Sequence, residues 1–251
     1  MRAEDRRSLS RSATRALDLL ELFGQERRAF RAVEIAGSLG LHRSTTNQML
    51  KTMLDSGHLV FDARDKTYLP SPRLAHFADW MTQAFGAGHD LRAMIRDLQR
   101  STGLIVTLAT PNDRFMQVID IAAPPGADNT RGLRIALFGS ALGAAYLSTL
   151  SASDIERLAE RNRVADDDQP RIIAAAASIA QIGHADAVAT TEAGGSAEAG
   201  PIRSLAMPLP LHGLNVPTVL GLAGPNAVVG PCVAHLVGEM HQAIARWAAD
   251  V

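Results

Sequence analysis

The 251-residue sequence has one cysteine and few aromatic residues. Because Cys232 stands alone, an internal disulfide framework and every CxxC zinc or redox motif are excluded. Aromatic residues make up 4% of the chain and hydrophobic residues 47%. A core rich in Ala and Leu favours an α/β or α+β fold over an aromatic-rich β-sandwich. The length suffices for two domains with separate cores.

The common catalytic and metal-binding motifs are also missing. There is no HExxH sequence, and the helical pair His235 and Glu239 gains no third ligand from His241. The sequence GSALG is not GxSxG, because Ser140 directly follows its glycine. GLAGPNAVVG fits neither the dinucleotide nor the phosphate-loop fingerprint. We therefore expect no enzyme activity, no catalytic residue, no bound metal and no cofactor.

No stretch has the composition of a membrane span. Residues 135–153 contain glycines and several Ser and Thr, and residues 204–238 contain five prolines that would break a spanning helix. Residues 1–23 mix arginines with acidic residues and lack the apolar segment of a signal peptide. We expect a cytoplasmic protein that does not enter the membrane.

Charge is distributed unevenly along the chain. The formal net charge is -1, but residues 1–78 carry 13 Lys and Arg against 9 Asp and Glu, whereas the remainder carries 12 against 17. The N-terminal third is therefore the part that is suited to a polyanion, although an excess of this size is a weak signal by itself.

The N-terminal third has the pattern of three helices followed by a hairpin. Helical spacing of apolar residues predicts helices over residues 13–23, 32–39 and 42–56, with Gly40 between the last two. Two short strands, 58–62 and 66–71, follow around a turn. Helix, glycine turn, helix and hairpin in this order indicate a winged helix-turn-helix, although an ordinary helix with a polar face is the competing interpretation.

The third helix begins with short polar side chains that can reach base edges in the major groove. Apolar residues 49, 50, 53 and 54 share one face, so we expect Arg43, Thr46, Asn47 and Lys51 to point away from the core. Basic residues there and in the hairpin would contact phosphates. The predicted DNA-binding residues are Arg43, Ser44, Thr45, Thr46, Asn47, Lys51, Arg64 and Lys66.

The remainder of the chain alternates strands and helices after a helical tract. Residues 79–98 look like a helical linker, and residues 99–251 look like an α/β sensor domain with a mainly antiparallel sheet. Strands are expected over 104–110, 115–122, 133–138, 204–210 and 218–225. Helices are expected from Ser140, after the cap Ser153, over 170–183 and over 231–250.

Along nearly its whole length the sequence resembles the IclR family of bacterial transcriptional regulators. RALDLLELF, EIAGSLGLHRSTTNQMLKTMLDSGHLV and YLPSPRL resemble the winged helix-turn-helix of that family, and GSALGAAYLSTL, IGHA and SLAMPLP stand in the order of its effector-binding domain. The resemblance implies an α+β protein with a DNA-binding domain at 1–78, a helical linker at 79–98 and a GAF/profilin-like effector domain at 99–251.

The resemblance also implies a homodimer or homotetramer that binds a double-stranded DNA operator and responds to a small-molecule effector. It places the effector against Ser140, Ala141, Leu142, Ser204, Gly221 and Ala223. Glu192, in the loop TTEAGG, is either a further polar contact or a solvated loop acid. Ala144 replaces a common lysine, and Gly221 and Ala223 stand where some members of the family have small hydroxyls. The resemblance therefore implies a less polar pocket, which favours an aromatic or larger apolar carboxylate over a small α-keto acid.

Gln48 stands where an arginine is usual in the family. A customary phosphate contact is therefore absent or is supplied elsewhere. This departure leaves open an alternative, a non-enzymatic small-molecule-binding protein that has lost specific operator recognition.

Overall fold

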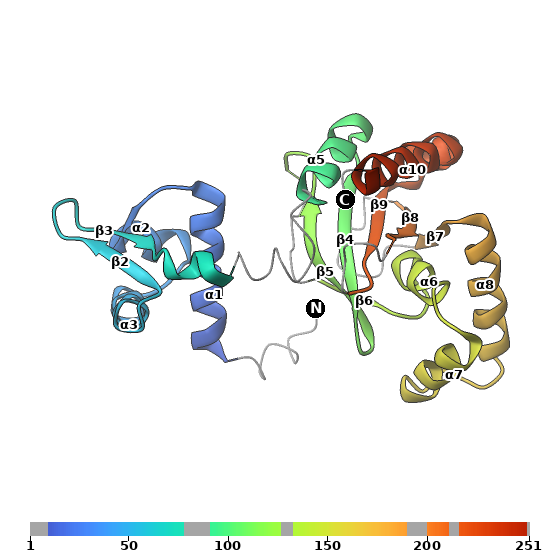
Figure 1. The fold of residues 1–251 in the computed structure, drawn as a ribbon, viewed down its shortest axis with the longest axis horizontal. Helices are drawn as coiled ribbons and strands as arrows, with labels where there is room; N and C mark the ends of the chain where they lie inside the picture. Colours follow the sequence, from blue (N-terminus) through green and yellow to red (C-terminus); the bar gives the residue numbers. More distant parts are fainter. Residues whose placement is uncertain (1–9, 78–90, 127–132, 190–199, 211–215, 250–251) are drawn as a thin grey trace. The chain divides into compact units, whose positions relative to one another are not determined.

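The computed structural model describes residues 10–77, 91–126, 133–189, 200–210 and 216–249. The chain divides into two compact units, residues 1–83 and 84–251 (Figure 1). The described part of residues 1–78 lies in the first unit, and the sensor-like part of the sequence lies in the second. Each unit therefore has its own hydrophobic core and is described separately below.

The N-terminal unit is a small helical domain with a three-stranded sheet. Its elements are α1 (Arg11–Glu26), β1 (Phe30–Arg31), α2 (Ala32–Ser38), α3 (Arg43–Asp55), β2 (Leu59–Asp62) and β3 (Thr67–Pro70). The sheet order is β1-β3-β2, and both pairings are antiparallel. The core consists of Leu19, Phe23, Phe30, Ile35, Leu50, Met53 and Leu59. Each secondary-structure element except β3 contributes at least one of these residues, so the helices and the hairpin share one apolar centre.

The C-terminal unit is built on a six-stranded antiparallel sheet with the order β6-β5-β4-β9-β8-β7. The strands are β4 (Ile105–Asn112), β5 (Phe115–Ala122), β6 (Arg134–Ala136), β7 (Ala185–Ala189), β8 (Ile202–Pro208) and β9 (Val219–Pro225). The helices are α5 (Leu91–Thr102), α6 (Ala141–Leu147), α7 (Ala152–Arg161), α8 (Gln169–Ile182), α9 (Asn226–Val229) and α10 (Val233–Ala249), with a 3-10 turn η2 (Gly230–Cys232) before α10.

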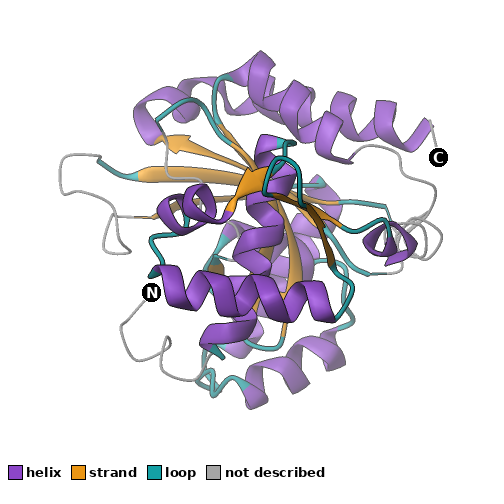
Figure 2. Ribbon diagram, turned by 90° about the vertical axis from the view of Figure 1, so that its left-hand side faces the viewer, coloured by secondary structure: helices purple, strands orange, loops and turns teal. Residues whose placement is uncertain are grey.

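Helices cover both faces of this sheet. On one face, α5 and α10 pack on the strands through a core that includes Ile95, Leu98, Met240 and Trp247. Figure 2 shows α10, which ends near the C-terminus, lying across the strands on that side. On the other face, α6 packs on the strands through Ala141, Leu142 and Ala145, and α8 packs against α6. Successive residues of the central strands β4, β8 and β9 therefore point into different cores.

Close packing under α6 depends on Gly143. A Cβ atom at this position would overlap the backbone carbonyl oxygen of Leu137. Because only glycine lacks that atom, α6 can lie directly on the segment that leads into it. Ser140 caps the helix, since its hydroxyl oxygen accepts a hydrogen bond from the backbone N–H of Gly143 at 3.1 Å.

The predicted fold class, a winged helix-turn-helix followed by a mainly antiparallel α+β domain, is confirmed. Strands β1 and β7 were not predicted, because β1 has two residues and β7 has the sequence ADAVA, whose alternation is weak. The predicted cap Ser153 is wrong, because Ser151 accepts the capping hydrogen bond from the N–H of Asp154.

The predicted linker overlaps α5, whose residues Ile95 and Leu98 belong to the C-terminal core. The rest of that linker, residues 79–90, lies outside the described residues. Among the described residues, no helix has both the length and the apolar character to cross a bilayer. Nor does that part of the chain hold a group of three His, Cys, Asp or Glu side chains arranged to bind a metal.

Candidate nucleic-acid interface and effector site

The turn between α2 and α3 is held by backbone hydrogen bonds and one glycine. Gly40 has φ +61, in the left-handed region that favours glycine. The N–H of Leu41 donates to the carbonyl of Ala36 at 2.9 Å, which closes the turn. His42 then caps α3, because its Nδ1 lies 3.5 Å from the N–H of Ser44 and accepts from it. These bonds fix the angle at which α3 begins.

Helix α3 has a buried face and an exposed polar face. The buried residues are Thr46, Leu50 and Met53, spaced by four and three positions. The exposed side chains occupy the opposite face: Arg43, Ser44, Asn47, Gln48, Lys51, Thr52 and Asp55. A helix presented in this way offers hydrogen-bonding groups over three turns, which is the geometry of a helix that enters the major groove.

The expectation that Thr46 points away from the core is wrong. Its side chain is only 1% exposed, and its hydroxyl donates to the carbonyl oxygen of His42 at 3.3 Å. The position is in phase with Leu50 and Met53, so the Thr46 side chain lies on the buried face of α3. Thr46 therefore supports the start of α3 and has no surface with which to contact a base.

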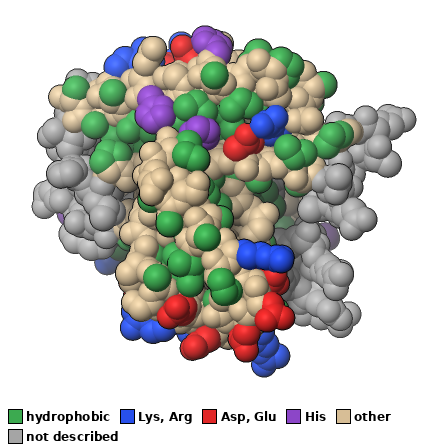
Figure 3. Space-filling model, turned by 90° about the vertical axis from the view of Figure 1, so that its right-hand side faces the viewer, with side chains coloured by type: hydrophobic (Ala, Val, Ile, Leu, Met, Phe, Trp, Pro, Cys, Tyr) green, Lys and Arg blue, Asp and Glu red, His purple; other side chains and the backbone are tan. Residues whose placement is uncertain are grey.

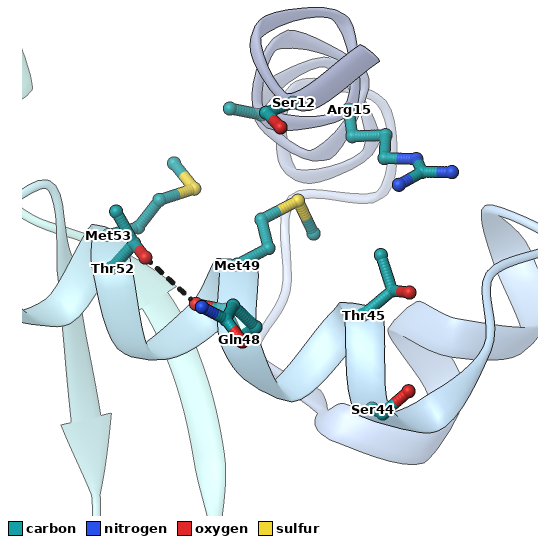
Figure 4. Close-up of a pocket in the computed structure, with 9 residues that line it drawn as sticks. Ser12, Arg15, Ser44, Thr45, Gln48, Met49, Thr52 and Met53 are labelled. Carbon is teal, nitrogen blue, oxygen red and sulfur yellow. Dashed lines mark hydrogen bonds between the residues drawn. The ribbon is translucent and has the colours of Figure 1, made fainter.

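A cavity of about 430 Å³ lies between α1 and α3. It is lined by Ser12, Arg15 and Ala16 of α1 and by Ser44, Thr45, Gln48, Met49, Thr52 and Met53 of α3. Figure 4 shows the guanidinium of Arg15 extending from α1 toward the side of α3 that carries Thr45. Thr45 is half-buried on this wall, unlike its exposed neighbour Ser44.

Arg15 is a cation near α3 that the sequence analysis missed. No acidic partner for it is found in the described part of the chain, and its half-buried side chain lines the cavity beside α3, one helical turn before the buried Leu19. The amphipathic pattern of RSATRALDLLELF places Arg15 outside the core. That pattern does not show that this side of α1 borders α3, because the contact depends on tertiary packing.

The hairpin β2–β3 carries two further basic residues at its tip. Arg64 and Lys66 are both exposed, and the N–H of Arg64 donates to the Asp62 carboxylate at 2.8 Å. The rings of Phe61 and Tyr68 lie opposite each other, with centroids 4.8 Å apart. This pair holds the two strands in register, so the tip has the form of a wing with cations at its end.

Not every cation of the N-terminal unit is available to a polyanion. Arg28 binds the carboxylate of Glu34 at 2.9 Å and lies over the ring of Phe30 at 3.9 Å. The backbone N–H of Arg31 and the side chain of Arg28 hold the pKa of Glu34 below its ordinary value. Arg28 is therefore engaged within the fold, whereas Arg15, Arg43 and Lys51 have no acidic partner among the described residues.

In the C-terminal unit, strand register brings several expected effector residues onto one sheet face. Ser204 of β8 lies opposite Ala223 of β9, and Ala206 lies opposite Gly221 two residues along. Ile105 of β4 and Ala187 of β7 extend the row that contains Ser204 and Ala223. This row, Ile105–Ala223–Ser204–Ala187, is half-buried along its length, so a ligand would meet two alanines, one isoleucine and one hydroxyl.

Helix α6 packs on the neighbouring row of strand residues, which contains Thr107, Gly221 and Ala206. A Cβ atom at Gly221 would lie 2.7 Å from Leu142 Cδ2 and 2.6 Å from Thr107 Oγ1. Ala141 and Leu142 are both buried. The hydroxyl of Ser140 donates to the carbonyl of Ala136 at 2.7 Å and also accepts the capping hydrogen bond. These groups therefore serve packing and capping in this structure, and Glu192 lies outside the described residues.

The cation nearest in sequence to Ser204 belongs to the other sheet face. Arg203 lies opposite Val188 in the register and binds the carboxylate of Asp186 through two hydrogen bonds, 2.8 and 2.5 Å long. These bonds hold the pKa of Asp186 below its ordinary value. Since successive residues of a strand point to opposite faces, Arg203 does not serve the row that contains Ser204.

The C-terminal unit has a cavity of about 520 Å³ whose lining is of mixed charge. Its lining consists of Tyr146, Leu150, Asp154, Arg157, Leu158, Glu160 and Arg161. Arg157 pairs with Asp154 across one turn of α7. Figure 3 shows acidic and basic side chains lying close together at one end of this face of the molecule. Opposite charges so close together leave no patch of one sign for a polyanion.

The two units define a protein with a winged helix-turn-helix and an antiparallel α+β domain of the sensor type. Residues 12–63 match the IclR helix-turn-helix domain. The transcriptional regulator XynR of Escherichia coli K12 is 22% identical over 152 residues, which span 59% of this chain and 60% of XynR. Residues 12–63 therefore form an IclR-type helix-turn-helix domain, and the chain is similar to helix-turn-helix transcriptional regulators of the IclR family.

Solved structures share the whole fold. The IclR regulator of Alicyclobacillus acidocaldarius is 21% identical with a TM-score of 0.57, and the alignment covers 96% of this chain and 98% of that one. The IclR protein of Thermotoga maritima is 15% identical with a TM-score of 0.55, covering 95% and 98%. At this identity the likeness concerns the fold alone.

Proposed function

We propose that this chain is a non-enzymatic regulator that binds an operator in double-stranded DNA through α3 and the wing. The observation that carries the proposal is the exposed face of α3, where polar side chains occupy three consecutive turns beside cations without acidic partners among the described residues. Short polar side chains read base edges, and the cations fix the helix on the phosphates.

The DNA contacts fall into two groups. Base edges are suited to Ser44, Asn47 and the exposed part of the half-buried Thr45, because these side chains are short and uncharged. Arg43, Lys51, Arg64 and Lys66 are suited to phosphates, and Arg15 joins them from α1. The proposal covers a homodimer or homotetramer that acts in the cytoplasm.

We further propose that a small organic effector binds the row Ile105–Ala223–Ser204–Ala187. The row supports an effector with a broad apolar or aromatic part, because three of its four side chains are apolar and two of these, Ala187 and Ala223, are small enough to let a ring approach the sheet. Ser204 would hydrogen bond to a polar group such as a carboxylate. If the effector weakens operator binding, the operator must weaken effector binding by the same factor.

The test of operator binding is a selection from a pool of random duplex DNA, followed by affinity measurements on the enriched site at several salt concentrations. We expect one enriched motif, and Lys51→Ala should reduce the slope of log affinity against log salt by about one. Arg171→Ala removes an exposed cation of α8 and should leave the slope unchanged. A native chain that enriches no motif, with or without metabolite extract, would favour the ligand-binding protein without operator function.

A further inference from the structure

Gln48 lies at the centre of the exposed face of α3. Ser44 precedes it by one helical turn and Thr52 follows it by one turn, and all three are exposed. Gln48 lines the 430 Å³ cavity toward α1 and also a second cavity of about 490 Å³ on the other side. Its side chain therefore stands between the two hollows, on the ridge that would enter a groove first.

The side-chain amide of Gln48 is available to a ligand. No hydrogen bond of its Nε2 or Oε1 atom is found among the residues that the structure describes. The hydroxyl of Thr52 donates to the backbone carbonyl of Gln48 at 2.9 Å, which Figure 4 marks with a dashed line. The amide therefore keeps one side free to donate and the other free to accept.

Gln48 is an uncharged residue among cations, so its expected role differs from theirs. Lys51 and Arg43 lie on the same helix and Arg15 borders the same cavity, so cations already flank this position. Asp55 ends the exposed face with a negative charge, which limits close approach to phosphates to the first three turns. An uncharged amide between cations adds little to phosphate binding but can form directional bonds to a base.

We propose that Gln48 reads an adenine in the major groove of the operator. Its Nε2–H would donate to adenine N7, and its Oε1 would accept from the adenine N6 amino group. An arginine at this position would instead match the two acceptors of guanine. The inference deepens the proposed operator binding and rests on it, because it assigns one residue of α3 to one base.

The experiment compares native protein, Gln48→Ala and Gln48→Arg in the same selection from random duplex DNA. We expect adenine at one motif position for the native chain, no preference there for Gln48→Ala, and guanine there for Gln48→Arg. The affinity of Gln48→Ala for the native motif should fall on the order of 10- to 100-fold. Because Gln48 is exposed and alanine favours helix, the thermal midpoint of Gln48→Ala should match that of the native chain.

A second measurement tests whether adenine N7 is the atom that accepts the hydrogen bond from Gln48. Replacing the selected adenine with 7-deazaadenine removes the N7 acceptor and should weaken native protein, while leaving Gln48→Ala unaffected. Lys51→Ala is the matched control on the same face, since it should weaken all sequences equally and keep the adenine preference. An unchanged motif for Gln48→Ala overturns the assignment of Gln48 alone. Absence of any motif for the native chain overturns operator binding and this assignment together.

Discussion

The two candidate sites are built in opposite ways. The α3 surface comes from one continuous helix whose polar side chains are exposed, whereas the Ser204 row comes from four strands and its side chains are half-buried. The first site depends on the phase of one helix. The second depends on sheet register and on how closely α6 packs beside it. We therefore expect single substitutions on the exposed face of α3 to change DNA binding, and single substitutions around α6 to change the stability of the fold.

The largest effect that sharpens this comparison is expected at Gly143. Gly143→Ala places a Cβ atom on the backbone carbonyl oxygen of Leu137, so α6 must move away from the segment that contains Leu137. We expect the free energy of unfolding to fall by about 3 kcal/mol. Urea denaturation followed by circular dichroism measures the change.

Gly238→Ala is the matched control, because Gly238 lies inside α10 with no atom within 4 Å of the added Cβ. Alanine should there raise the free energy of unfolding by about 0.5–1 kcal/mol, through its better helix propensity and the smaller entropy of the unfolded chain. Equal urea midpoints for the two variants would show that α6 is not seated as described.

The next effect compares two neighbours on α3. Thr46→Ala removes a buried hydroxyl that bonds to His42, so the free energy of unfolding should fall by about 1–2 kcal/mol. Asn47→Ala changes an exposed residue, so stability should stay within about 0.5 kcal/mol while operator affinity falls roughly tenfold. Thermal denaturation and fluorescence anisotropy with labelled operator measure the two quantities. A stable Thr46→Ala variant without base preference would restore Thr46 to the reading surface.

Residues 46 and 221 show how far the sequence predicts each site. The elements around α3 followed from helical spacing and from Gly40, and the fold class followed from them. Thr46 differs from the prediction because its phase with Leu50 and Met53, and not the polarity of its side chain, decides that it is buried. The spacing of residues 46, 50 and 53 by four and three positions is that of one helix face, which predicts that Thr46 is buried.

The effector site was less predictable, because its geometry is non-local. The contact of Gly221 with Leu142 joins residues 79 positions apart in the sequence, and no local pattern encodes it. The family resemblance supplied the residue set, but register decided which of them share a face. Arg15 was missed for the same reason, since its proximity to α3 follows from packing between two helices.

The smallest effect concerns the ion pair at the edge of the C-terminal sheet. The hydrogen bonds from Arg203, followed by its charge and that of His184, hold the pKa of Asp186 below its ordinary value of 3.8. A carboxyl group with a lowered pKa in the folded protein stabilises it above the ordinary pKa, and this contribution is lost as the pH falls through the folded value. Since Arg203 and Asp186 are 26% and 27% exposed, solvent screens the pair in part, and we expect it to make only a small contribution to stability.

Arg203→Met should therefore lower the free energy of unfolding slightly at neutral pH, and its difference from the native chain should shrink below about pH 3.8. Urea denaturation at several pH values measures this difference. Arg171→Met removes an exposed arginine of α8 and should change stability little at any pH. Because Arg203 lies on the α5 and α10 face, its loss should also leave binding at the Ser204 row unchanged. A variant that loses effector binding while keeping its stability would place the arginine in the ligand site and contradict the separation of the two sheet faces.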